Sequence, residues 1–230
     1  MAKNILIVGA SSGIGAELKI QLEREGNQVF SLGRKAVSSK GHLFFDATSE
    51  DAITIPEDWP DSFHGLVYAP GSILLKPFNR LVASDFRNDF QINVLGFVHV
   101  LQAFLPRLKK ANGSSVVVFS TVAAKIGLGF HASISAAKGA LEGLALSLAS
   151  ELSPSKIRVN AIAPSLTETP LAANLLNTPE KVEASSKRHP IQRIGTVNDM
   201  AAAARFFLSE DSSWITGQCL TIDGGLSKIK

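Results

Sequence analysis

The chain has 230 residues, of which 45% are hydrophobic and 19% are charged, and its formal net charge is +3. This length is enough to bury a large core, and the composition excludes a disordered chain. The basic residues are spread along the sequence, and the one short basic cluster, residues 187–189, is interpreted as a solvated face rather than a nucleic-acid surface. We therefore expect one soluble domain of enzyme size that spans residues 1–230.

Cysteine usage and the lengths of the apolar runs limit the chain further. The single cysteine, Cys219, rules out an internal disulfide and offers no pair of metal ligands. The first four residues lead directly into an apolar run and leave no room for a signal peptide, and no apolar run is long enough to span a membrane. We expect a cytoplasmic protein that carries no metal and binds neither a membrane nor nucleic acid.

The first apolar run and the glycines after it form the most informative stretch of the chain. Residues 5–8 are typical of a buried parallel strand, and a helical pattern begins near residue 14. A glycine-rich turn between them places free backbone N–H groups and the positive end of a helix dipole at one point, which suits a phosphate or pyrophosphate. An ordinary tight turn from strand to helix is the alternative interpretation. The residues expected to contact the phosphates are Gly9, Ser11, Ser12, Gly13, Ile14 and Gly15.

Strand and helix signals alternate along the rest of the chain. Apolar strands are predicted at 28–32, 42–45, 65–69, 115–119, 158–163 and 219–222, and helices at 14–25, 84–110, 133–152 and 197–209. This alternation predicts βαβ units and an α/β fold with a doubly wound parallel sheet. Residues 50–62 contain two prolines, so this crossover is predicted to be a loop with little helix. Residues 164–190 contain four prolines, and we expect them to form a lid over the C-terminal edge of the sheet.

Several short motifs stand in an order and spacing that are specific together, although each alone is a weak signal. They are Gly9, Gly13 and Gly15, then Asn93 in Ile-Asn-Val-Leu-Gly, Lys138 in Ser-Ala-Ala-Lys-Gly-Ala-Leu, Arg-Val-Asn-Ala-Ile-Ala-Pro at 158–164, Trp-Ile-Thr-Gly-Gln at 214–218 and Ile-Asp-Gly-Gly at 222–225. In these motifs the chain resembles the short-chain dehydrogenase/reductase family over nearly its whole length. The resemblance implies a Rossmann-type fold, a nicotinamide cofactor and a homotetramer or homodimer.

The end of the second strand bears on the choice of cofactor. An acidic residue there would bind the ribose hydroxyls of NAD, whereas a nearby arginine accommodates the 2′-phosphate of NADP. This chain has Gly33 at the acidic position and Arg34 directly after it, which favours NADP(H) over NAD(H), although a solvated loop arginine is the alternative. The resemblance implies that Asp46 meets the adenine. It implies further cofactor contacts from Ala47, Ala69, Gly71, Lys138, Pro164, Thr167 and Thr169.

The active site is where the chain departs from the family it resembles. The family's proton-donating tyrosine lies four residues before the lysine, and Ile134 stands there. The one tyrosine, Tyr68, lies elsewhere, in a turn that replaces the family's glycine- and asparagine-rich turn. Thr121 matches the family serine and retains a hydroxyl, while Lys138 and Asn93 match their family counterparts. A standard Ser-Tyr-Lys carbonyl reductase is therefore not expected.

Other groups stand near the position of the missing tyrosine. His131 lies seven residues before Lys138, nearly two helical turns, where enoyl reductases of this superfamily place their tyrosine. Histidine is the usual acid or base near neutral pH, although one just before a helix is more often a solvent-exposed terminal residue. Ser133 and Ser135 are further possible donors, although capping is their more usual role at the start of a helix.

Two classes of function follow. The first is an NADP(H)-dependent oxidoreductase that acts on a carbonyl, alcohol or activated C=C group, with Thr121, Lys138, Asn93 and His131 as catalytic residues. The second is a catalytically impaired, NADP-binding regulatory or scaffold protein. Leucines in the predicted lid indicate a small apolar substrate, unless they only pack on the sheet. Apolar faces on the predicted helices 84–110 and 133–152 exceed what one sheet surface needs and predict a homo-oligomer, most simply a tetramer.

Overall fold

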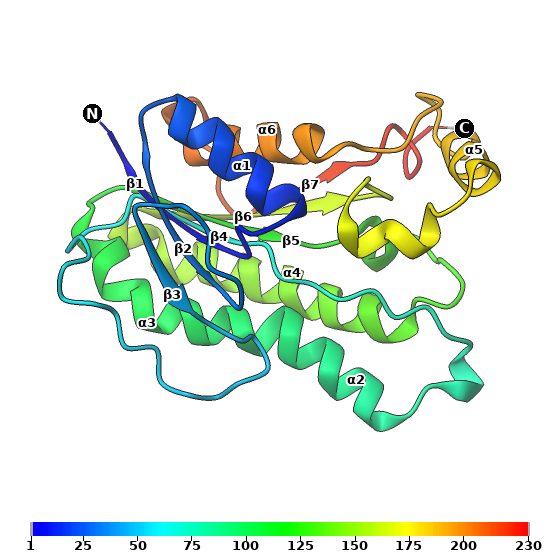
Figure 1. The fold of residues 1–230 in the computed structure, drawn as a ribbon, viewed down its shortest axis with the longest axis horizontal. Helices are drawn as coiled ribbons and strands as arrows, with labels where there is room; N and C mark the ends of the chain where they lie inside the picture. Colours follow the sequence, from blue (N-terminus) through cyan, green and yellow to red (C-terminus); the bar gives the residue numbers. More distant parts are fainter. Residues whose placement is uncertain (1, 230) are drawn as a thin grey trace.

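A parallel β-sheet forms the centre of the computed structural model, which describes residues 2–229 (Figure 1). Its strands run in the order β3-β2-β1-β4-β5-β6-β7, and every neighbouring pair is parallel. The strand order reverses between β1 and β4, and open sheets of this kind bind ligands at the carboxyl ends of the strands beside such a reversal. The predicted doubly wound parallel sheet is thus confirmed. The strands are β1 (Asn4–Val8), β2 (Gln28–Gly33), β3 (Gly41–Phe44), β4 (Gly65–Tyr68), β5 (Ser114–Phe119), β6 (Ile157–Pro164) and β7 (Cys219–Ile222).

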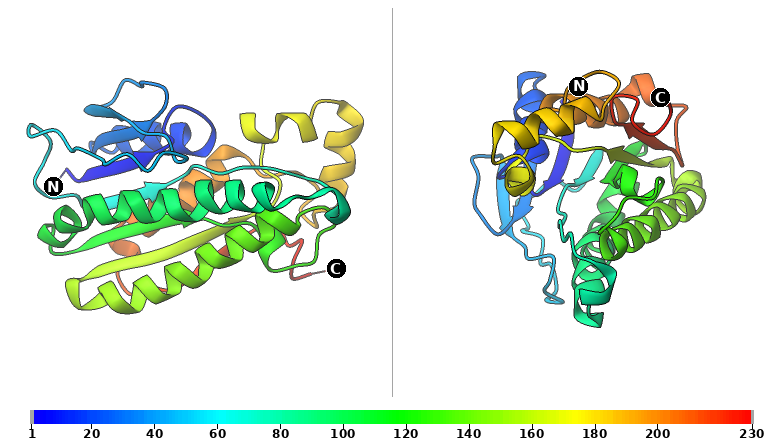
Figure 2. Two further views of the ribbon diagram at one scale, coloured as in Figure 1. Left: turned by 90° about the horizontal axis from the view of Figure 1, so that it is seen from below. Right: turned by 90° about the vertical axis from the view of Figure 1, so that its right-hand side faces the viewer.

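Helices cover both faces of this sheet because its buried strands carry apolar side chains on both faces. In β1, Ile5 and Ile7 pack under α1 (Gly13–Arg24) and α6 (Val197–Leu208). Leu6 and Val8, which alternate with them, belong to the core on the opposite face. That face is covered by α3 (Gly96–Lys110) and α4 (Ala132–Leu152), and α2 (Ala83–Phe90) packs against α4. These are the green helices in Figure 2.

The predicted helix over 84–110 is confirmed, because helical structure runs without a gap from Ala83 to Lys110, but it is not a regular α-helix throughout. A π-helical stretch, Gln91–Leu95, separates α2 from α3. The Asn93 side-chain amide donates to the carbonyl oxygen of Asp89 at 2.7 Å, and in an α-helix the backbone N–H of Asn93 would use that oxygen. Stretches of π-helix inside longer helices often occur at functional sites.

The two irregular crossovers agree with the sequence-based expectations in part. No helix forms between β3 and β4 among the described residues, as predicted from the prolines there. The predicted lid contains a short 3₁₀ helix, Pro170–Leu175, and α5 (Pro179–Lys187). Shorter 3₁₀ turns lie at Phe78–Arg80, Val122–Ala124, Ser153–Ser155 and Glu210–Ser212. Within residues 2–229, no helix is both long and apolar enough to cross a membrane.

The two tryptophans have opposite surroundings. Trp59 anchors the irregular crossover to the sheet: it is buried, and its ring centroid lies 5.0 Å from that of Phe30. Phe63 and Phe104 complete this aromatic cluster. Trp214 follows α6 and is 99% exposed.

Candidate cofactor site and active site

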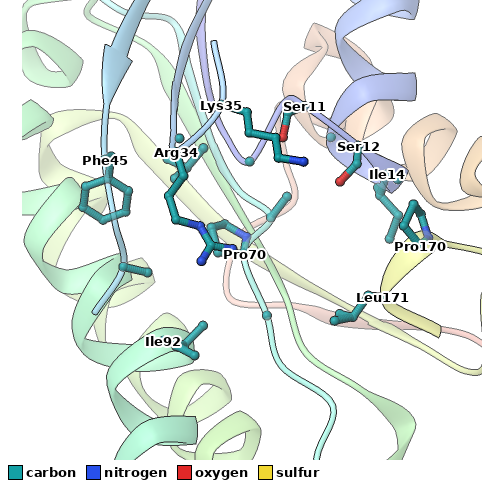
Figure 3. Close-up of a pocket in the computed structure, with 18 of the residues that line it drawn as sticks. Ser11, Ser12, Ile14, Arg34, Lys35, Phe45, Pro70, Ile92, Pro170 and Leu171 are labelled. Carbon is teal, nitrogen blue, oxygen red and sulfur yellow. The ribbon is translucent and has the colours of Figure 1, made fainter. Parts of the chain in front are cut away.

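A cavity of about 480 Å³ lies at the carboxyl ends of β1, β2 and β4, beside the reversal of strand order (Figure 3). Six separate segments form its walls: the β1–α1 turn, the end of β2, the segment after β3, the segment after β4, the π-helical stretch and the lid. The residues that line it are Val8, Gly9, Ser11, Ser12, Gly13, Ile14, Gly15, Gly33, Arg34, Lys35, Phe45, Asp46, Ala47, Thr48, Ala69, Pro70, Gly71, Ile92, Thr169, Pro170 and Leu171.

The β1–α1 turn is shaped for close approach of a ligand to the backbone. Gly9 and Gly13 have φ angles of +84° and +55°, which L residues with side chains rarely adopt. A Cβ atom on Gly15 would lie 2.3 Å from the carbonyl oxygen of Gly9, so only glycine fits there. No side chain caps α1 at Ser12, and the first turn of α1 has no acidic residue. The free N–H groups and the positive helix end are therefore available to an anion in the cavity.

The end of β2 adds positive charge to the same cavity. Arg34 and Lys35 both line it, and Figure 3 shows their side chains projecting from the end of β2 into this space. Across from them, the Asp46 carboxylate accepts hydrogen bonds from the backbone N–H of Thr48 at 2.9 Å and from its hydroxyl at 2.8 Å. These bonds, and more weakly the charge of Arg34, lower the pKa of Asp46 below its usual value.

The structure places most of the predicted cofactor contacts on this cavity. Those that line it are Gly9, Ser11, Ser12, Gly13, Ile14, Gly15, Arg34, Asp46, Ala47, Ala69, Gly71 and Thr169, whereas Lys138, Pro164 and Thr167 do not. Sequence reasoning missed several lining residues, including Lys35, Pro70 and Ile92. The sequence does contain a signal for Lys35, because this residue directly follows Arg34 and forms a basic pair with it. It contains no signal for Ile92, because the position of Ile92 depends on the π-helical stretch.

Lys138 and Asn93 lie together behind Gly71. A Cβ atom on Gly71 would be 3.6 Å from Nζ of Lys138 and 3.5 Å from Oδ1 of Asn93, so the glycine lets both polar atoms approach the cavity wall. Lys138 is buried, and its Nζ donates to the carbonyl oxygen of Phe119 at 2.6 Å. Burial lowers the pKa of Lys138 to about 7, although the charge of Asp89 acts in the opposite direction.

Two residues that the sequence did not single out complete this group. Ser72 donates to Oδ1 of Asp89 at 2.6 Å and accepts a hydrogen bond from the Asn93 amide at 2.9 Å. Among the described residues, Oδ2 of Asp89 and Oδ1 of Asn93 are buried without a hydrogen-bond partner. Asp89 lies one turn before Asn93, but a lone aspartate in a helical pattern carries no signal of such a role.

The candidate proton donors have different surroundings. Thr121 begins the 3₁₀ turn after β5, where its hydroxyl accepts from the backbone N–H of Ala123 at 3.3 Å. Nδ1 of His131 lies 2.6 Å from the carbonyl oxygen of Gly129, which makes Nδ1 the donor and leaves Nε2 as the second ring nitrogen. Neither side chain lines the cavity. Tyr68 donates its hydroxyl to the carbonyl oxygen of Ile92 at 2.6 Å, and burial raises its pKa.

The residue at the family's tyrosine position lies at the start of α4 and is buried. Ile134 is a buried core residue, 5% exposed. The expectation that Ser133 or Ser135 caps the helix is wrong, because α4 begins at Ala132 and no side chain caps it. Ser135 instead donates to the carbonyl oxygen of Ala123 at 2.9 Å.

The comparisons with known proteins agree with this fold. Residues 9–227 match the family model described as enoyl-(acyl carrier protein) reductase. A tropinone reductase homolog of Arabidopsis thaliana is 31% identical, with 97% of this chain and 92% of the relative covered. The 7alpha-hydroxysteroid dehydrogenase of Escherichia coli K12 is also 31% identical, over 97% and 93% of the two chains.

Solved structures show the same likeness. The ligand-free aldohexose dehydrogenase of Thermoplasma acidophilum superimposes with a TM-score of 0.87 at 27% identity, over 98% of this chain and 94% of the other. A short-chain type dehydrogenase/reductase from Mycobacterium ulcerans gives a TM-score of 0.87 at 28% identity, over 97% and 89%. The chain therefore belongs to the short-chain dehydrogenase/reductase family of oxidoreductases.

Proposed function

We propose that this protein is an NADP(H)-dependent oxidoreductase that acts on a carbonyl, alcohol or activated C=C group of a small apolar substrate. One observation carries the proposal. A single cavity combines an uncapped helix N-terminus with the cationic pair Arg34 and Lys35, and Gly71 at its wall brings it next to Lys138 and Asn93. The relatives named as dehydrogenases and reductases support carbonyl and alcohol chemistry.

The residues present fit this cofactor. The glycine turn leaves room for a pyrophosphate where a Cβ would clash with Gly9, and the two cations supply the charge that a 2′-phosphate requires. Asp46 would contact the adenosine, and Lys138 would hold the ribose next to the nicotinamide. When bound, the cofactor supplies or accepts the hydride. The hydroxyl of Thr121 would orient the reacting oxygen of the substrate.

Arg34→Ala is expected to weaken NADPH binding by about 1–3 kcal/mol, the usual range for a hydrogen bond between charged groups. NADH affinity should stay nearly unchanged, because NADH has no 2′-phosphate. Titration of intrinsic fluorescence with each cofactor measures both affinities. Arg24→Ala is the matched control, since Arg24 ends α1 and does not line the cavity. Equal affinities of the unmodified protein for the two cofactors would contradict the preference.

We propose His131 as the proton donor in place of the missing tyrosine. His131→Ala is expected to lower turnover by ~10²–10⁴-fold, the usual contribution of a general acid, while NADPH affinity is retained. Unchanged turnover in the variant would exclude this role.

The alternative is a catalytically impaired, NADP-binding regulatory or scaffold protein. The buried Ile134 favours it, because an aliphatic side chain donates no proton. NADPH binding together with no turnover of ketones, aldehydes or activated alkenes would establish this alternative.

We also propose that the protein assembles as a homotetramer. Phe90, Leu95 and Leu146 leave apolar surface exposed on the π-helical stretch and the neighbouring helices α2 and α4. Burial of these side chains against a second copy would stabilise a symmetric assembly. Light scattering at micromolar concentration should return the mass of four chains, and a monomer mass would contradict the assembly.

A further inference from the structure

A group of buried polar side chains lies behind the cavity wall at Gly71. Asp89 is 3% exposed, Asn93 is fully buried, and Lys138 is 6% exposed. Ser72 links Asp89 to Asn93 through two hydrogen bonds of 2.6 and 2.9 Å. The Asn93 amide also bonds the backbone carbonyl of Asp89, which fixes the two residues relative to each other across one helical turn. Burial of these polar and charged side chains costs more free energy than burial of apolar side chains of the same size would. This cost indicates that the group has a function.

The Lys138 ammonium is the charge that needs compensation there. A buried ammonium loses its hydration, and a single carbonyl oxygen, that of Phe119, does not supply an opposite charge. Ile134, one turn before Lys138 on α4, carries no ionisable group. Asp89 belongs to the same buried group, and its negative charge opposes the effect of burial on the pKa of Lys138.

Two other charged groups on these helices have partners elsewhere. Asp85, one turn before Asp89 on α2, forms an ion pair with Lys76 at 2.9 Å. Glu142, one turn after Lys138 on α4, accepts a hydrogen bond from Ser120 and lies 4.0 Å from Lys125. By contrast, Asp89 accepts a hydrogen bond from the neutral hydroxyl of Ser72, and its Oδ2 is buried without a hydrogen-bond partner among the described residues.

We propose that Asp89 is a positioning residue whose carboxylate favours the charged form of the Lys138 side chain. The inference deepens the proposed function and rests on it, since Lys138 is the residue proposed to hold the ribose of the cofactor. In a site without a tyrosine, Asp89 is then the built-in counter-charge of the lysine. An electrostatic role of this kind requires the carboxylate itself, whereas a role in packing requires only its shape.

The test is the titration of Lys138 itself, followed by NMR in protein that contains lysine labelled with ¹³C at Cε. Lys138→Met identifies the signal, because it removes that signal alone. In Asp89→Asn, which preserves the shape of the side chain and its acceptor for Ser72, the titration of Lys138 should move to lower pH by about one unit or more. Ser72→Ala, which leaves both charges in place, should leave the titration within about half a unit of the original. Asp85→Asn is the control on the same helix and should have no effect.

Two outcomes would overturn the proposal: an unchanged titration in Asp89→Asn, or the same shift in Ser72→Ala as in Asp89→Asn, which would assign the effect to packing. If Asp89→Asn does not fold, Asp89→Ser, which also carries no charge, decides. The titration of Lys138 should again move to lower pH, and an unchanged titration would also overturn the proposal. None of these measurements requires turnover. A protein that binds no cofactor or reduces no substrate would contradict the proposed function and leave this result intact.

Discussion

Gly15→Ala is expected to abolish cofactor binding, with a loss of affinity of more than about 100-fold. The added methyl group would lie 2.3 Å from the carbonyl oxygen of Gly9 and 3.0 Å from its carbonyl carbon, and both are backbone atoms. The turn must therefore open or α1 must move away from β1, and either shift removes the N–H groups from their places around a pyrophosphate. Overpacking of this kind also costs about 1–3 kcal/mol of folding free energy.

Gly143→Ala is the matched control. It makes the same substitution inside a helix, on α4, but no atom lies within 4 Å of the added methyl group. The substitution should raise the free energy of unfolding by about 0.5–1 kcal/mol, as for an ordinary change from glycine to alanine in a helix. Calorimetric titration with NADPH and thermal unfolding measure the two effects. Wild-type affinity in Gly15→Ala would show that the β1–α1 turn does not hold the phosphates.

The second large effect is on stability as a function of pH. Lys138 in the folded protein has a pKa of about 7, far below the value of about 10.4 in an unfolded chain. Between these values the unfolded chain binds one proton more than the folded protein, so the free energy of unfolding rises with pH. From pH 7 to pH 9 the gain should be about 2 kcal/mol. Urea unfolding of the cofactor-free protein at a series of pH values measures it.

Lys138→Met provides the control, because methionine keeps most of the aliphatic stem and does not titrate. The variant should lose the rise between pH 7 and pH 9 and should be more stable than the unmodified protein at pH 7. Above pH 9 a second group, the Cys219 thiol, also changes the free energy of unfolding. Burial raises the pKa of the Cys219 thiol to about 11, and the earlier ionisation of this thiol in the unfolded chain lowers stability there. A flat profile for the unmodified protein would contradict the lowered pKa of Lys138.

The parts of the fold that depend on local patterns could be predicted from the sequence. The predicted strand 219–222 coincides with β7, and the predicted helix 133–152 differs from α4 by one residue. Alternation of short apolar runs with helical periods specifies βαβ units because each strand is buried on both faces. The spacing of Gly9, Gly13 and Gly15 likewise predicted the position of the cavity, because each of these glycines is required by a local backbone conformation or a local contact.

Features that depend on side chains meeting in space could not be predicted. The π-helical stretch within the predicted helix 84–110 is one such feature. There the Asn93 amide binds the carbonyl oxygen of Asp89, a contact that no periodic pattern in the sequence predicts. The group of Ser72, Asp89 and Asn93 has the same origin, because Ser72 arrives from the loop after β4. The lid was predicted from its prolines, but its contacts with the cavity were predicted only in part. Of the predicted contacts, Thr169 lines the cavity, whereas Pro164 and Thr167 do not; Pro170 and Leu171 were not predicted.

The contrasting positions of the two tryptophans provide the protein with separate optical reporters. Trp59, enclosed by Phe30, Phe63 and Phe104, should emit at short wavelength, whereas Trp214 should emit as in water. Iodide should quench the long-wavelength component alone. Unfolding should therefore appear as a red shift of the Trp59 component over a constant background from Trp214. If an assembly covers the surface around Trp214, its emission should shift to the blue and escape iodide, so one spectrum would distinguish association from folding.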